Sequence, residues 1–191
     1  MKKNFKRRDF LKKAGMAGAG AAAISTFPAP AIAAGHQEWI ICSAFGKAGL
    51  LGQAIQAFAD SINNYSEKLK IKVYHAGELV PGLESLDAVR SGAAQASYGA
   101  PYYWTNLSDA IEFVATCPFG MNAMEQNAWC YYGGGIEEAD KIYNALGLKF
   151  LPMGNTGNQM GGWFNKEINT PADYKGLKMR MPGLGGRTIE K

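Results

Sequence analysis

In the first half of the chain, apolar residues recur with the periods that are typical of strands and of helices. Short apolar or alternating runs at residues 38–44, 71–74 and 94–99 predict three strands. Between them, apolar residues recur at helical spacing over residues 51–65, and a shorter helix is expected over residues 83–90. Strands that alternate with helices favour right-handed βαβ units and a mostly parallel sheet.

A second pattern begins after Pro118-Phe119-Gly120. A long helical stretch is predicted over residues 123–146, and the glycines at 133–135 interrupt it. This break near residue 120 indicates two lobes, residues 34–120 and 121–191. The expected later elements are strands at 148–153, 161–165 and 177–181, a short helix near 171–174, and a helix that starts at 184. Because the chain stops inside that last helix, we expect a fragment of a longer protein.

The first 33 residues predict an export signal that is not part of the fold. A basic segment containing Arg7-Arg8 precedes a weakly apolar stretch and an Ala-x-Ala cleavage pattern. The twin arginine and the modest hydrophobicity indicate export by the Tat translocase, with cleavage after Ala33 or, as the alternative, after Ala31. The apolar stretch is also shorter than the roughly 20 residues that span a bilayer. The other interpretation is a basic tail before a short helix.

Removing this segment changes the charge balance. Residues 1–33 carry seven of the 20 Lys/Arg and one of the 16 Asp/Glu, which leaves 13 against 15 and a formal charge of −2. The positive excess therefore belongs to the signal, and no basic patch remains to indicate nucleic acid as a partner. Cys42, Cys117 and Cys130 lack metal-ligand spacing, and at most one pair could form a disulfide. Buried, apolar thiols are the favoured interpretation.

Candidate chemistry is sparse, and it lies mainly at the ends of predicted strands. No catalytic motif with Ser/His/Asp, H-E-x-x-H or P-loop spacing is present. Tyr102 and Tyr103 follow the third predicted strand and form either a core aromatic cluster or the wall of a binding site. The segment from Asn155 to Gln159 either forms a turn or offers amide oxygens to a ligand or cation. Arg180 is either a solvated strand charge or a guanidinium that grips a carboxylate.

Five sequence blocks, taken together and in order, carry a resemblance to a known family. From about Glu38 to its end, the chain resembles the solute-binding subunits of tripartite ATP-independent periplasmic (TRAP) transporters, the DctP family, and within it the TakP-like, α-keto acid-binding branch. The blocks are VYHAGELVPGLESLDAVRSGAAQ at 73–95, APYYW at 100–104, PFGMNAMEQNAWCYYGGG at 118–135, GNTGNQMGGWFNKEI at 154–168 and GLKMRMPGLGG at 176–186.

The resemblance implies an α/β, two-lobed periplasmic binding protein fold, type II-like, with a hinge between the lobes. Here that fold is truncated before the chain returns to lobe 1. It also implies a receptor in the periplasm of a Gram-negative bacterium, not an enzyme. Such a receptor binds a small 2-oxo or hydroxy carboxylate and delivers it to TRAP membrane permease subunits.

The same resemblance implies roles for particular residues. Arg180 would bind the substrate carboxylate, and Gln159 would bind both the ligand and a metal ion, sodium or calcium. Tyr102 and Tyr103 would contact the ligand from the first lobe, with Asn155 at the turn beside it. No cofactor other than the cation is implied, and full-length relatives can form a homodimer.

Two other functions fit an exported α/β chain. One is a Tat-exported periplasmic enzyme with a cofactor, although the spacing of Cys and His offers no ligand set for one. The other is a solute-binding protein of an ABC transporter, which has a similar shape. Neighbouring genes for two membrane subunits without an ATPase would favour the TRAP system.

Overall fold

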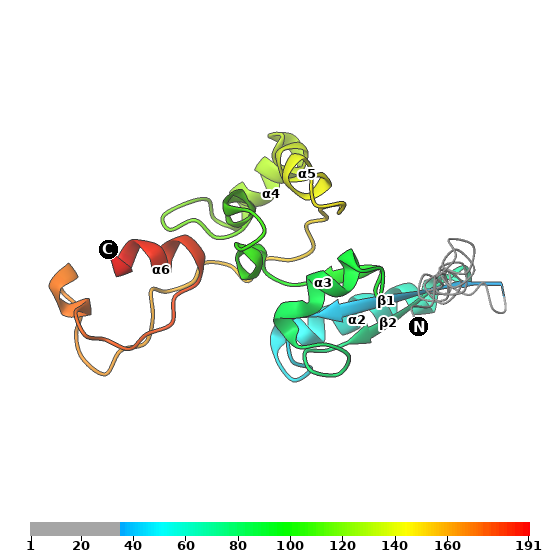
Figure 1. The fold of residues 1–191 in the computed structure, drawn as a ribbon, viewed down its shortest axis with the longest axis horizontal. Helices are drawn as coiled ribbons and strands as arrows, with labels where there is room; N and C mark the ends of the chain where they lie inside the picture. The colour runs from blue at the N-terminus through cyan, green and yellow to red at the C-terminus, as the bar shows by residue number, and fades with distance from the viewer. Residues whose placement is uncertain (1–34) are drawn as a thin grey trace, which may run out of the picture.

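A computed structural model describes residues 35–191, so the predicted signal and its cleavage site lie outside the described residues. Three parallel strands form a sheet in the order β2-β1-β3 (Figure 1). They are β1 (Gln37–Ser43), β2 (Leu69–Tyr74) and β3 (Ala96–Tyr98). The central strand aligns Ile41 with Val73 on one side and with Ala96 on the other. The parallel βαβ arrangement predicted from the sequence is therefore confirmed.

The two faces of this sheet are covered by different helices, because successive side chains of a strand point in opposite directions. Ile41 packs with Ile55 of α2 (Leu50–Tyr65) on one face. On the other face, Cys42 packs with Ala88 of α3 (Ser85–Arg90). A short turn of 3-10 helix, Gly82–Glu84, leads into α3, as expected from the helical pattern there.

Side-chain amides hold α2 and the loops to the strands. Asn63 on α2 donates to the carbonyl of Ile71 at 2.9 Å and accepts from its amide at 2.7 Å, so one residue satisfies both backbone groups on β2. Gln95 accepts from the amide of Ile40 at 2.7 Å before β3 begins. These contacts supply backbone partners where the ladder does not.

A second hydrophobic cluster joins the sheet region to the helices that follow it. Two segments of 3-10 helix, Pro101–Trp104 (η3) and Asp109–Val114 (η4), lead from β3 to α4 (Ala123–Tyr132) and α5 (Gly135–Asn144). Gly134 has a φ of 83° between α4 and α5, so the predicted interruption of the long helix is confirmed. The buried members of the cluster are Leu86, Trp104, Ile111, Val114, Ala139 and Tyr143.

The three strands predicted at 148–153, 161–165 and 177–181 are wrong. These segments run in extended or irregular form, and within residues 35–191 none of them is paired in a sheet. A strand exists only when a neighbour accepts and donates its backbone hydrogen bonds, and an apolar alternating run cannot supply that neighbour. The predicted helices are present, as the 3-10 turn η5 (Pro171–Tyr174) and as α6 (Gly183–Glu190).

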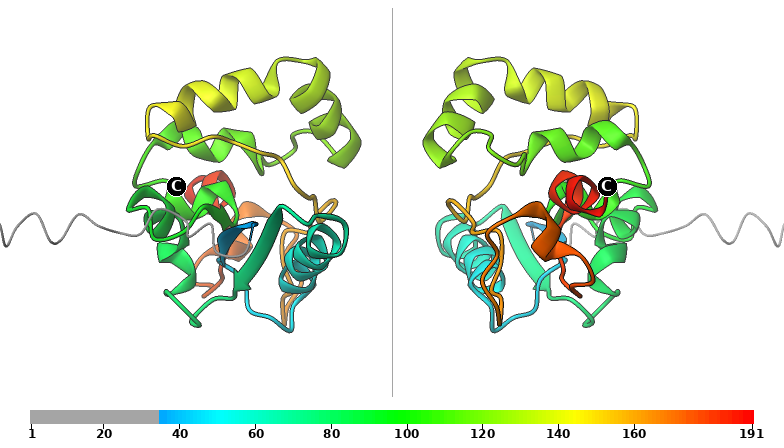
Figure 2. Two further views of the ribbon diagram at one scale, coloured as in Figure 1. Left: turned by 90° about the vertical axis from the view of Figure 1, so that its right-hand side faces the viewer. Right: turned by 90° about the vertical axis from the view of Figure 1, so that its left-hand side faces the viewer.

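The last helix returns to the segment that follows β3. Figure 2 shows α6, in red, beside the green segment that contains η3 and η4. An ion pair between Arg187 of α6 and Glu112 of η4 joins the two. Segments far apart in the sequence are thus brought to one place. Among the described helices, none combines the length and the apolar character needed to cross a membrane.

Replacing Ile111 by Ala tests whether the second cluster supports the fold. Ile111 is fully buried, and we expect Ile111→Ala to lower the free energy of unfolding by about 2–5 kcal/mol, because it leaves a cavity. Phe113 lies in the same 3-10 segment but is 55% exposed, so Phe113→Ala should cost less than about 1 kcal/mol. Urea unfolding followed by circular dichroism measures both. Equal losses for the two variants would contradict the assigned core.

Candidate functional site

Aromatic side chains gather at the carboxyl ends of β1 and β3. Phe45 follows β1 and meets Tyr98, the last residue of β3, edge to face with ring centroids 5.5 Å apart. The ring centroid of Tyr103 lies 6.0 Å from that of Phe45 and 5.1 Å from that of Tyr102. The carboxyl edge of a parallel sheet is where ligands bind in open α/β folds.

The Tyr-Tyr-Trp block divides between the two interpretations that its sequence allowed. Trp104 is buried in the second cluster, and its indole donates to the carbonyl of Leu83 at 2.8 Å. Tyr102 and Tyr103 are only half-buried, so parts of both rings remain accessible. The tryptophan belongs to the core, whereas the tyrosine pair is only partly covered.

Arg180 lies beside this tyrosine pair. Burial raises the pKa of the Tyr102 hydroxyl, Tyr103 adds to that rise, and the neighbouring Arg180 guanidinium opposes it. The Arg180 guanidinium is a close neighbour of the hydroxyl, and a cation there favours the phenolate. The structure therefore brings Arg180 to the adjacent tyrosines Tyr102 and Tyr103, although Arg180 is far from them in the sequence.

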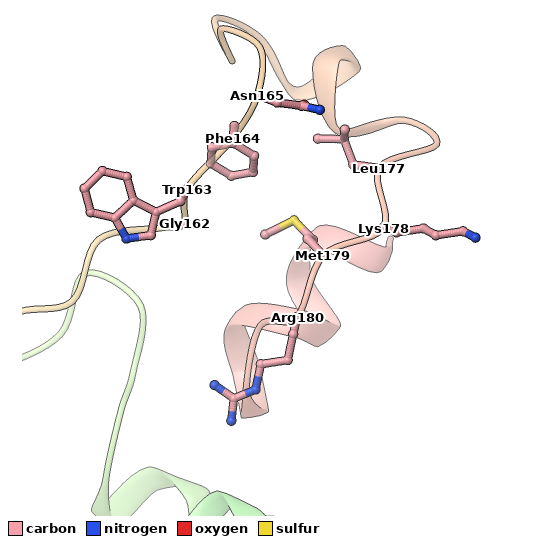
Figure 3. A pocket seen from close by; sticks show the side chains of 8 residues that line it. All are labelled: Gly162, Trp163, Phe164, Asn165, Leu177, Lys178, Met179 and Arg180. Atoms are coloured by element: carbon pink, nitrogen blue, oxygen red, sulfur yellow. The ribbon is translucent and has the colours of Figure 1, made fainter. Parts of the chain in front are cut away.

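A pocket of about 440 Å³ lies next to Arg180, lined by residues 162–165 and 177–180. Figure 3 shows the Arg180 side chain extending away from Phe164 and Met179, on the side where α6 lies. Trp163 is 91% exposed on the other side of the pocket. This volume lies within the range of small-molecule sites, roughly 300–1,000 Å³.

The polar loop around Asn155 and Gln159 is exposed and hydrogen-bonds within itself. Asn155 accepts from the amide of Gly157 at 2.8 Å, and Gln159 donates to the hydroxyl of Thr156 at 3.1 Å. Thr156 also lines a second cavity with Phe45, Gly46 and residues 48–52, so the loop lies near the end of β1. Asn155 thus shapes the turn, as its side chain was expected to do in one of two interpretations.

No group of three or more His, Cys, Asp or Glu side chains that could hold a metal ion occurs in the part of the chain that the structure describes. A cation there would take amide and carbonyl oxygens, the hard ligands that sodium and calcium accept. The oxygen of Gln159 is such a donor. The three cysteines are free, and burial raises the pKa of the thiols of Cys42 and Cys130, which keeps them protonated.

Three residues near the site were not predicted from the sequence. Gly183 lies against Tyr102, and Glu112 and Arg187 form an ion pair beside it. A lone acidic residue in the apolar run at 111–114 could have indicated a buried, paired carboxylate. The partner could not be found in this way, because nothing in the spacing connects η4 to α6.

A guanidinium beside tyrosines at the carboxyl edge of a parallel sheet is an arrangement that could bind a small anion, and comparison with known proteins identifies the family. Residues 44–191 match the model of the bacterial extracellular solute-binding proteins, family 7, the DctP family. The chain belongs to this family. It is 48% identical over 124 residues to a monocarboxylate 2-oxoacid-binding periplasmic protein of Nostoc sp. (strain PCC 7120), covering 65% of this chain and 34% of that protein.

Solved structures of TRAP periplasmic solute-binding proteins share the fold. One from Pseudoalteromonas atlantica, with bound sodium and pyruvate, is 41% identical with a TM-score of 0.77, covering 81% of this chain and 48% of that one. One from Colwellia psychrerythraea, with calcium and pyruvate, gives the same four values. One from Bordetella bronchiseptica, with calcium and picolinate, is 30% identical with a TM-score of 0.77, covering 81% of this chain and 47% of that one.

These matches confirm the α/β binding-protein fold and the resemblance to the DctP family. The chain spans about half the length, or less, of the relatives it matches. The family consists of solute-binding proteins, which favours the receptor over the exported enzyme and the ABC-type protein. The boundary between lobes near residue 120 stays a prediction.

Replacing Arg180 by Met tests the contact with Tyr102 without any ligand. We expect Arg180→Met to raise the pKa of the Tyr102 hydroxyl, because the cation that favours the phenolate is removed. A titration of ¹³Cζ-labelled tyrosine by NMR measures it, with Tyr102→Phe to assign the resonance. Lys178→Met, which removes an exposed cation from the same segment, should leave the Tyr102 pKa unchanged. An unchanged pKa in Arg180→Met would contradict the contact.

Proposed function

We propose that this protein is the periplasmic receptor of a TRAP transporter and binds a small 2-oxo monocarboxylate such as pyruvate. The observation that carries the proposal is the position of Arg180 beside Tyr102 and Tyr103 at the carboxyl edge of the sheet. Relatives that share the family and the fold support it, because they bind pyruvate or 2-oxo acids.

Each of the three side chains has a separate role in this proposal. The Arg180 guanidinium pairs with the ligand carboxylate through two parallel hydrogen bonds, which are about twice as strong as bonds between neutral groups. Tyr102 and Tyr103 supply an apolar wall and hydroxyl groups for the 2-oxo oxygen. The pair is strongest where water is excluded, since the local dielectric constant is lower there.

Closure of the two lobes over the ligand follows from where these residues lie. Tyr102 and Tyr103 belong to the proposed first lobe, 34–120, and Arg180 to the second, 121–191. A ligand shifts the balance between open and closed forms only if it contacts the closed form better. A carboxylate held by Arg180 while its other end touches the tyrosines meets that condition.

A cation accompanies the ligand in this proposal. The related structures contain sodium or calcium together with the carboxylate. Gln159 is the candidate ligand for both, and Asn155 holds the turn that presents it. A cation beside a bound carboxylate offsets part of its charge and so favours the burial of the anion.

The protein's location and partners follow from the same proposal. The signal at 1–33, with Arg7-Arg8, would direct the folded protein through the Tat translocase to the periplasm, and replacing both arginines by lysine separates Tat from other export routes. The ligand would then pass to the TRAP membrane permease subunits. A homodimer of the full-length protein is a further part of the proposal.

Replacing Arg180 by Ala tests the role of the guanidinium in ligand binding. We expect Arg180→Ala to weaken pyruvate binding by about 2–5 kcal/mol, because a charge-assisted contact in a closed site is lost. Isothermal calorimetry on the chain measures it, with Lys178→Ala as the matched control. Pyruvamide, which has no carboxylate, should bind the parent and Arg180→Ala equally weakly. If Arg180→Ala binds pyruvate as tightly as the parent does, the carboxylate is held elsewhere.

Removing the cation tests the role of Gln159. In sodium-free buffer with a calcium chelator, we expect weaker pyruvate binding, which added calcium restores. Gln159→Ala should be weaker than the parent with calcium present and should respond less to its removal. Asn158→Ala, a neighbouring exposed amide, is the control. The same response to calcium in Gln159→Ala and in the parent would exclude Gln159 as a ligand of the cation.

A further inference from the structure

Glu112 is a fully buried carboxylate close to the site. It lies in η4 between core residues Ile111 and Val114. A buried carboxylate is costly unless a cation pairs with it. The Arg187 guanidinium of α6 is that cation, and it also lies 3.4 Å from the exposed Asp109 carboxylate. The pair therefore fixes α6 to η4.

The start of α6 lies directly on the same carboxylate. Gly183, the first residue of α6, has a φ of 54°, and a Cβ there would come within 2.9 Å of Glu112 Oε2 and 3.1 Å of Tyr102 Cβ. The backbone of α6 can approach Tyr102 this closely only because residue 183 has no side chain. The positive end of the α6 dipole also faces the carboxylate, which stabilises the charge.

Arg180 directly precedes this seated helix. Only Met181 and Pro182 separate it from Gly183, so the location of its backbone follows that of the first turn of α6. Neither Glu112 nor Arg187 lines the pocket beside Arg180. We propose that the Glu112–Arg187 ion pair is a positioning device that seats α6 on Tyr102 and thereby holds the Arg180 guanidinium at the Tyr102-Tyr103 pair. This inference rests on the proposed function only for the identity of the ligand that Arg180 binds.

The charge of Glu112 gives a test that separates positioning from a direct electrostatic effect. Removing an anion near Tyr102 would by itself lower the pKa of the tyrosine hydroxyl. If Glu112 instead holds Arg180 in place, Glu112→Gln releases the guanidinium, and the Tyr102 pKa rises toward the value in Arg180→Met. The two mechanisms therefore predict shifts of opposite sign.

The experiment follows the ¹³Cζ resonance of Tyr102 in the ligand-free chain through a pH titration. We expect an upward shift in the Tyr102 pKa for Glu112→Gln and for Arg187→Met. In Arg187→Lys, which keeps a cation, the Tyr102 pKa should lie between those of the parent and Arg187→Met. Adding Glu112→Gln to Arg180→Met should cause no further upward shift. Lys191→Met, at the end of α6, is the control for the loss of a cation. A lower or unchanged Tyr102 pKa in Glu112→Gln would overturn the proposal. If that variant does not fold, an upward shift for Arg187→Met that persists in the Arg180→Met background would overturn it as well.

A second arm measures pyruvate affinity and separates this inference from the proposed function. Glu112→Gln and Arg187→Met should each bind pyruvate about tenfold more weakly, a size typical of coupling through packed elements. Parent-like affinity in both variants overturns the positioning role at the binding site. If the parent itself does not bind pyruvate, the proposed function fails, while the Tyr102 titration still decides the positioning role.

Discussion

One close approach governs the candidate site: the backbone of Gly183 lies against Tyr102 and the carboxylate of Glu112. A side chain at position 183 would have no room, and the φ of Gly183 lies in the left-handed region that favours glycine. The helix that starts there carries Arg187, which neutralises Glu112, and it follows the segment that carries Arg180. Packing, charge pairing and site geometry therefore depend on a single backbone contact between η3, η4 and α6.

The elements that the sequence predicted well are those whose pattern is local. The alternation in β1 places Ile41 and Cys42 on opposite faces, and Ile55 and Ala59 follow from the 3.6-residue period of α2. Phe58, which shares that period, is instead 42% exposed, because period alone does not say how wide the covered face is. The failed strands between 148 and 181 show the same limit for sheets. Only the segment 177–181 alternates cleanly, and even there a strand needs a partner that no local pattern specifies.

The candidate site shows what a resemblance adds and what it leaves open. Arg180 alone could have been a solvated strand charge, and the matched blocks are the basis of its proposed role. Its proximity to Tyr102, however, is a tertiary fact, as is the buried Glu112–Arg187 pair. Both depend on how α6 packs after the chain has passed through α4, α5 and η5. Spacing along the chain cannot supply such contacts, since they link segments through long and irregular connections.

In the proposed function, these features serve a binding protein that recognises the charge and shape of its ligand. A guanidinium and two tyrosines can hold a small carboxylate, and α6 holds the guanidinium in turn. The most direct test is a crystal structure of the chain grown with pyruvate and calcium. The proposal predicts the pyruvate carboxylate paired with both terminal nitrogens of Arg180, with Tyr102 in contact with the ligand. A carboxylate bound elsewhere, with Arg180 free of it, would contradict the proposal.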